Sequence, residues 1–181
     1  MNSIKVNYLY RLLGIVLSLF LSNNLKSQVS IKEFTEDLNT YDFSDPNPIP
    51  IFVSNPKIYP YFTFDGYNIE SKLKNFKVIE LENDYIKVLI TPELGGKVWG
   101  AIDKTSGEEF IYKNEVVKFR NISMRGPWTS GGIEFNFGII GHHPSTATPV
   151  DYKIRKNNDG SVSCFVGNID LPSRSQWRVE I

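Results

Sequence analysis

Cysteine is almost absent, since Cys164 is the only one among 181 residues. An intrachain disulfide is therefore impossible, and a buried, unreactive thiol is the usual role of such a residue. We expect the fold to depend on its hydrophobic core and not on covalent cross-links.

The sequence also lacks an apolar run that is long enough to span a membrane. The run at residues 12–21 is about half of the roughly 20 residues that a transmembrane helix needs. Lys5 and Arg11 provide a positive start, and a polar stretch follows that ends in Ser27. This pattern is typical of a secretory signal. We predict a signal peptide over residues 1–27, a secreted or periplasmic protein and no stable membrane span after cleavage; an uncleaved anchor is the alternative.

No block of basic residues is present. The chain has 20 basic and 20 acidic residues, and loss of the leader with Lys5, Arg11 and Lys26 would leave 17 and 20. A net charge of about −3 without a basic patch is unlike the electrostatic footprint of a nucleic-acid-binding protein. We expect no nucleic-acid partner.

Several common catalytic motifs are missing as well. The sequence contains no G-x-S-x-G elbow, no P-loop and no dinucleotide fingerprint. The pair Gly95-Gly96, taken alone, predicts a turn or bulge in a sheet. We expect no bound cofactor.

Short strand-like segments separated by turns make up most of the rest. After an irregular, proline-rich lead-in over residues 28–56, alternating apolar residues and turn sequences predict hairpins and single strands. The predicted strands cover residues 57–64, 75–82, 85–91, 97–103, 109–112, 150–156, 161–167 and 176–181. This arrangement predicts an all-β, antiparallel sandwich or barrel. A final segment that breaks off inside a predicted strand is typical of a piece of a longer protein.

Residues 119–149 differ from their surroundings. They contain five Gly, three Pro, both His and only three charged residues. A long loop of this kind in a compact domain usually carries function.

Six side chains of this segment are candidate site residues. Arg125, Asn136 and His142 are hydrogen-bonding groups suited to sugar hydroxyls, and Trp128 offers a flat apolar face. Glu134 is a candidate acid or base, although glycoside chemistry generally needs two carboxylates. The candidates are His142 and Glu134 for catalysis, and Arg125, Trp128, Asn136 and His143 for substrate binding.

Each candidate also has a structural interpretation. Trp128 is equally consistent with a core position, and Glu134 with an ion pair to Arg120 or Arg125. His143, which precedes a proline, fits a structural loop residue. Adjacent histidines point to opposite sides of an extended backbone, so we predict no metal site.

Two segments carry a resemblance to a known family. Residues 89–100 (LITPELGGKVWG) resemble the early signature of the galactose mutarotase-like (aldose epimerase-like) superfamily, in which a strand runs through a proline and a Gly-Gly pair into a second strand. Residues 130–138 (SGGIEFNFG) followed by 141–143 (GHH) are similar in layout to its hexose-6-phosphate epimerase relatives. Residues 78–181 look like an uncharacterised domain of that superfamily, found in exported and tetratricopeptide-repeat bacterial proteins.

The resemblance implies a fold and a function. It implies that residues 57–181 form the N-terminal half of an antiparallel β-supersandwich, with Arg125 and His142 as sugar ligands. Epimerases of this type use a His as general acid and a Glu late in the domain as base, which would lie beyond Ile181. We therefore expect an exported carbohydrate-handling domain, carbohydrate-active in its full-length form. The alternatives are a non-catalytic glycan-binding or structural module, or an inactive fragment that lacks its C-terminal half.

Overall fold

The protein is all-β and mainly antiparallel, as the strand pattern predicts. The computed structural model describes residues 28–55, 60–64, 66–122, 126–136, 142, 145–171 and 173–181. Ten strands and one short 3-10 helix make up its regular structure: β1 Ser30–Tyr41, β2 Lys72–Glu82, β3 Ile86–Thr91, η1 Pro92–Leu94, β4 Lys97–Asp103, β5 Glu109–Ile111, β6 Val116–Ile122, β7 Gly126–Thr129, β8 Asp151–Lys156, β9 Val162–Asp170 and β10 Ser175–Glu180. Within those ranges, no helix has the length and hydropathy needed to cross a bilayer.

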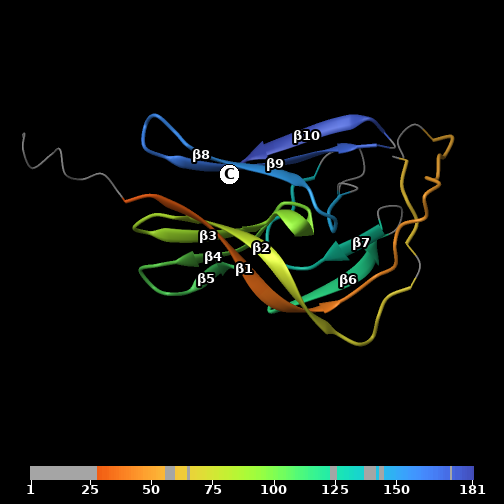
Figure 1. The fold of residues 1–181 in the computed structure, drawn as a ribbon, viewed down its shortest axis with the longest axis horizontal. Coiled ribbons are helices and arrows are strands. Elements are labelled where there is room, and N and C mark those ends of the chain that lie inside the picture. The colour runs from red at the N-terminus through yellow and green to blue at the C-terminus, as the bar shows by residue number, and fades with distance from the viewer. Residues whose placement is uncertain are drawn as a thin grey trace, which may run out of the picture.

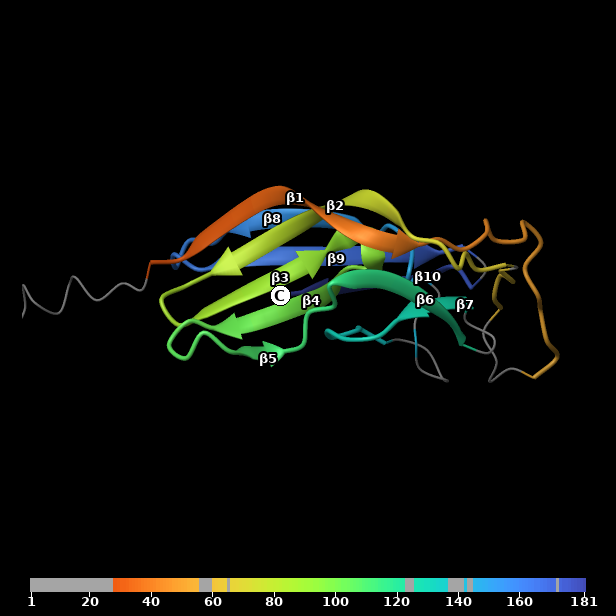
Figure 2. The same ribbon diagram turned by 90° about the horizontal axis from the view of Figure 1, so that it is seen from below.

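The strands form two layers. The larger sheet has the order β5-β4-β3-β2-β1-β6-β7, and the smaller has the order β10-β9-β8. The smaller sheet lies over one face of the larger one (Figure 1). Seen from below, the larger sheet twists strongly between β5 and β7 (Figure 2), as sheets of L-residues do. Every strand pair is antiparallel except β1 with β6.

The predicted hairpins are confirmed, and their turns are closed by side chains. Asn83 Oδ1 accepts hydrogen bonds from the backbone N–H groups of Tyr85 and Ile86 at 2.8 Å each. Asp103 Oδ1 accepts from Thr105 N at 2.7 Å in the turn after β4. Asn and Asp are favoured in turns because their short side chains bond to nearby backbone in this way.

The lead-in over residues 28–56 differs from the prediction in its first part. Ser30–Tyr41 forms β1, which pairs with β2 along eleven residues and lies inside the larger sheet. Its apolar side chains lie on opposite faces, with Ile31 packed between the sheets and Leu38 on the other side. The strand therefore lacks the one-sided alternation that marks a half-buried strand in a sequence.

Two clusters of buried side chains form the core. The first fills the space between the sheets and includes Ile79, Ile90, Val166 and Trp177. The second lies on the opposite face of the larger sheet and includes Trp99. Cys164 is buried in the first cluster, and burial raises the pKa of its thiol to about 11. The predicted inert thiol is therefore consistent with its surroundings.

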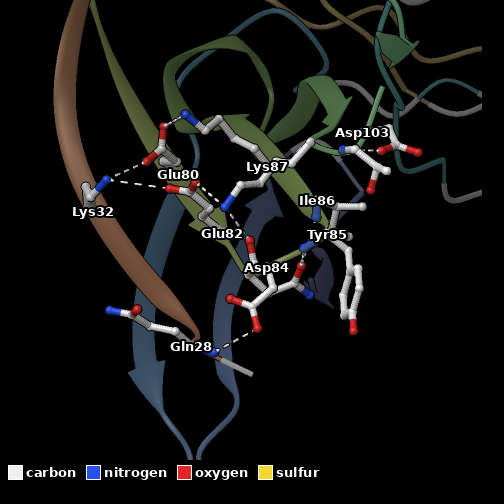
Figure 3. Close-up of polar contacts among 12 residues, drawn as sticks. Gln28, Lys32, Glu80, Glu82, Asp84, Tyr85, Ile86, Lys87 and Asp103 are labelled. Carbon is white, nitrogen blue, oxygen red and sulfur yellow. Dashed lines mark hydrogen bonds and ion pairs between the residues drawn. The ribbon is translucent and has the colours of Figure 1, made fainter. Parts of the chain in front are cut away.

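Alternating charges cover the outer face of the first three strands. Lys32 of β1 lies 3.1 Å from Glu80 and 3.6 Å from Glu82 of β2, and Lys87 of β3 lies 3.3 Å from Glu80 (Figure 3). Glu82 also pairs with Lys104 at 2.8 Å. Cross-strand pairs of opposite charge favour this register over a slipped one.

Gly95 ends η1 where other backbone comes very close. Its φ is +74°, and a Cβ there would lie 2.3 Å from the carbonyl oxygen of Thr146. Its N–H donates to Thr148 O at 2.9 Å. The predicted turn at Gly95-Gly96 is thus confirmed, and it holds the 145–148 segment against the start of β4.

We predict that Gly95→Ala destabilises the protein much more than Gly107→Ala. Both glycines have φ near +75°, but a Cβ at Gly107 meets nothing within 4 Å. Gly107→Ala, the control, should lose only about 1–2 kcal/mol of stability, because alanine is strained in the left-handed conformation. Gly95→Ala must also displace backbone and should lose roughly 3 kcal/mol or more. Urea unfolding followed by circular dichroism measures both changes, and equal losses would contradict the close contact.

Candidate functional site

A buried lysine begins β4. Lys97 is only 1% exposed, although most lysines reach solvent. Its Nζ donates hydrogen bonds to Thr129 O at 2.8 Å, Thr129 Oγ1 at 3.1 Å and Gly131 O at 2.9 Å. These three acceptors match the three N–H bonds of an ammonium group, so the end of β7 and the loop after it are tied to β4.

The loop after β7 docks directly on the β4 backbone. Val98 and Ile133 exchange two backbone hydrogen bonds of 3.1 and 2.8 Å. Gly132 makes this possible, because its φ is +67° and a Cβ there would lie 2.1 Å from Val98 O. The pair Gly131-Gly132 therefore brings Glu134 close to Lys97. The Glu134 carboxylate acts to raise the pKa of Lys97.

Glu134 and His142 form a direct pair. Nδ1 of His142 lies 2.9 Å from Oε1 of Glu134, and a carboxylate can only accept, so the ring N–H donates. The Glu134 side chain is 9% exposed and the His142 side chain is 36% exposed. The second oxygen, Oε2 of Glu134, is buried and has no hydrogen-bond partner among the described residues. The pair leaves Nε2 as the ring nitrogen that a ligand could contact.

Trp128 joins these residues into one cluster. Its ring lies edge-on to the His142 imidazole, with centroids 6.0 Å apart and planes at 73°. Lys97 Nζ lies 5.8 Å from the Trp128 centroid, within cation–π range. We call Lys97, Trp128, Glu134 and His142 the Lys97 cluster.

The electrostatics of the cluster follow from burial and proximity. Burial lowers the pKa of Lys97 to about 8, and the nearby Glu134 carboxylate opposes this shift.

His142 has a φ of +41°, which is uncommon for a residue other than glycine. Backbone held in such a sparsely populated region often marks a functional site.

The structure brings three of the six predicted site residues together. Trp128, Glu134 and His142 meet in the Lys97 cluster. Asn136 is exposed, two residues along the chain from Glu134. Arg125 and His143 lie outside the described residues, so their predicted roles stay predictions.

The alternative interpretation of Glu134, an ion pair with Arg120 or Arg125, is only partly tested. Among the described residues Glu134 pairs with His142, and a pair with Arg125 lies outside them. Lys97 itself was missed. Its signal was a single charge in the otherwise apolar start of a strand, KVWGA, directly after the glycine pair.

The cluster offers two metal-ligating side chains at most. Among the described residues, no group of three or more His, Cys, Asp or Glu side chains could hold a metal ion. The cluster can accept and donate hydrogen bonds around the partly buried Trp128 indole, and it can exchange a proton within the carboxylate–imidazole pair.

Comparison with known proteins identifies relatives. The sequence pattern of the family described as "Domain of unknown function (DUF5107)" matches residues 54–181. The structure is also similar to the crystal structure of a TPR-domain containing protein from Parabacteroides distasonis, with a TM-score of 0.73 and 30% sequence identity. That similarity covers 86% of this chain and 27% of the other, so this chain spans about a quarter of that protein.

We predict that Lys97 makes stability depend on pH in the alkaline range. Its pKa is about 8 in the folded protein and 10.5 ordinarily. Between these values the unfolded chain binds a proton that the folded chain does not, so stability from this group rises with pH. Wild type should gain about 1–3 kcal/mol over Lys97→Met between pH 7.5 and pH 10.

Urea unfolding at each pH measures this difference. Lys153→Met, which removes an exposed lysine of β8, corrects for the alkaline titration of the rest of the chain. A difference between wild type and Lys97→Met that stays constant with pH would contradict a folded-state pKa lowered by burial.

Proposed function

The chain belongs to the DUF5107 family, and we propose that it is an exported domain that recognises carbohydrate at the Lys97 cluster. The observation that carries the proposal is the contact of Glu134 with His142 beside the Trp128 ring. Sugar rings present an apolar face for an aromatic side chain and hydroxyl groups for polar ones. A few convergent polar groups around an aromatic wall are typical of small-molecule sites.

The local geometry favours hydroxyl groups over a strongly charged ligand. The ammonium of Lys97 already donates to three protein oxygens, so it has no N–H left for an anion. His142 Nε2 can donate or accept, depending on its protonation. Asn136, on the exposed side of the same segment, adds an amide group with both capacities.

Two further observations support the proposal. The resemblance of residues 89–100 and 130–143 to the galactose mutarotase-like superfamily points to sugars independently of the geometry. The predicted leader at residues 1–27 would deliver the domain to a compartment where glycans are present. Fold and family alone do not define an activity.

We predict that the domain binds neutral sugars and that binding depends on Trp128. Calorimetry with glucose and galactose, after a glycan array to select longer ligands, measures affinity. Trp128→Ala should weaken binding about tenfold or more, because it removes an apolar contact worth roughly 1.5 kcal/mol. Tyr85→Ala removes an exposed aromatic ring in the β2–β3 turn and should leave affinity unchanged. No binding to any glycan would overturn the proposal.

A second candidate is catalysis of mutarotation, which the Glu134–His142 contact favours. Glu134 would stabilise the imidazolium form of His142. The imidazolium would give its Nε2 proton to the ring oxygen as the bond from that oxygen to the anomeric carbon breaks. A base beyond the assigned residues would take the proton of the anomeric hydroxyl, and ring closure would reverse both transfers.

We predict that Glu134→Gln slows such a reaction at least tenfold, because a neutral amide stabilises the imidazolium less well. Polarimetry of α-glucose or α-galactose follows the reaction, and Glu108→Gln, in an exposed turn, is the matched control. If wild type binds sugar but does not exceed the buffer rate, the domain is a recognition module without this activity.

A further inference from the structure

The outer face of β6 carries two cations without an acidic partner in the described part of the chain. Lys118 and Arg120 are both exposed, and they lie two positions apart, so their side chains point to the same side of the strand. Phe119, between them, points the other way into the core. Neither cation forms an ion pair with a described residue. Asp42, which follows β1, is bonded by Lys74 at 2.6 Å.

A pocket lies beside these two cations. Its volume is about 280 Å³, and its lining includes Tyr41, Tyr67 and Asn68 together with Lys118 and Arg120. None of the described residues that line it is acidic. Aromatic walls with a few convergent polar groups are typical of ligand sites. Two cations in such a pocket favour a ligand that joins an anionic group to a ring with an apolar face.

Contacts within the chain hold the walls of this pocket. Lys118 lies beside Tyr41 where β1 and β6 run parallel, and its Nζ lies 4.7 Å from the centroid of the Tyr41 ring. This cation–π contact positions the ammonium group at the pocket. The backbone N–H of Asn68 donates to Asp42 O at 2.9 Å, so the 67–68 segment is attached to the end of β1. The pocket is therefore built by the sheet and by a segment that is bonded to it.

The same face of the sheet continues to Trp128. In the antiparallel pair of β6 and β7, Arg120 lies directly opposite Trp128. Opposite residues share a face, with Cβ atoms about 5 Å apart. Figure 2 shows β6 and β7 side by side. The basic pocket and the Lys97 cluster therefore adjoin each other, and one short saccharide chain can contact both.

We infer that the pocket binds a carboxylate group of an acidic saccharide whose neighbouring sugar unit lies on Trp128. The inference rests on the proposed recognition of carbohydrate, and it names the class of glycan. The Arg120 guanidinium is suited to a carboxylate because it donates through two parallel N–H bonds, and Lys118 adds a second positive charge. A nucleic acid fits less well, because two cations on a chain with 20 basic and 20 acidic residues do not form a basic track.

Trigalacturonate and its methyl ester test the inference, because they share their sugar rings and differ in charge. Calorimetry at low salt should show that the protein binds the acid at least about fivefold more tightly than the ester, as expected for two exposed ion pairs. This preference should decrease severalfold in about 1 M NaCl, where the Debye length is about 3 Å. The double variant K118Q/R120Q should bind the acid and the ester equally.

Two further variants separate the pocket from other effects. K153Q/R178Q also removes one lysine and one arginine, from exposed positions on the smaller sheet, and should keep the preference for the acid. Trp128→Ala should weaken the binding of acid and ester by the same factor, because it removes a ring contact that both ligands make.

The outcomes distinguish this inference from the proposed carbohydrate site. An ester that binds through Trp128 as tightly as the acid, or a preference that persists in K118Q/R120Q, would overturn the inference and leave the proposed site intact. Binding of the acid alone, lost in K118Q/R120Q and kept in Trp128→Ala, would support the pocket and count against the Lys97 cluster. Acetate or a single-stranded oligonucleotide that binds as tightly as trigalacturonate would overturn the assignment to a saccharide.

Discussion

The buried ammonium group of Lys97 needs oxygen acceptors. This need determines how the end of β7 and the loop after it lie against β4. A charge removed from water costs several kcal/mol unless it is hydrogen-bonded. Among the described residues, Lys97 meets this requirement through Thr129 and Gly131. Any arrangement that moved β7 or its following loop away from β4 would leave the ammonium without partners. The position of Trp128, and of the Glu134–His142 pair beyond it, depends on this constraint.

Glycine at two places makes the constraint geometrically possible. Backbone approaches backbone at Gly132 and at Gly95, where a side chain would overlap a carbonyl oxygen. Both contacts attach an irregular segment to β4, one at each side of Lys97. A rigid sheet that positions functional groups on loops is a common way to build a site. Here the contact at Gly132 positions the loop after β7, and the contact at Gly95 positions the 145–148 segment.

Much of the fold could be predicted locally. Alternation of apolar residues and the turn residues Asn83, Asp103 and Asn157 are read within a few positions of the chain, and the hairpins that they predict are present. The strand β1 escaped prediction because Ile31 and Leu38 are buried on different faces. A strand that contributes to two cores has no simple period.

The sequence by itself determined the all-β class, the hairpins and the segment that holds Trp128, Glu134 and His142, because each depends on residues close together in the chain. Only the tertiary structure decided that Lys97 is buried among them and that Glu134 pairs with His142. The acceptors of Lys97 lie 32 and 34 positions away. No local pattern records such a contact, since it exists only when the sheet has brought β4 and the end of β7 together.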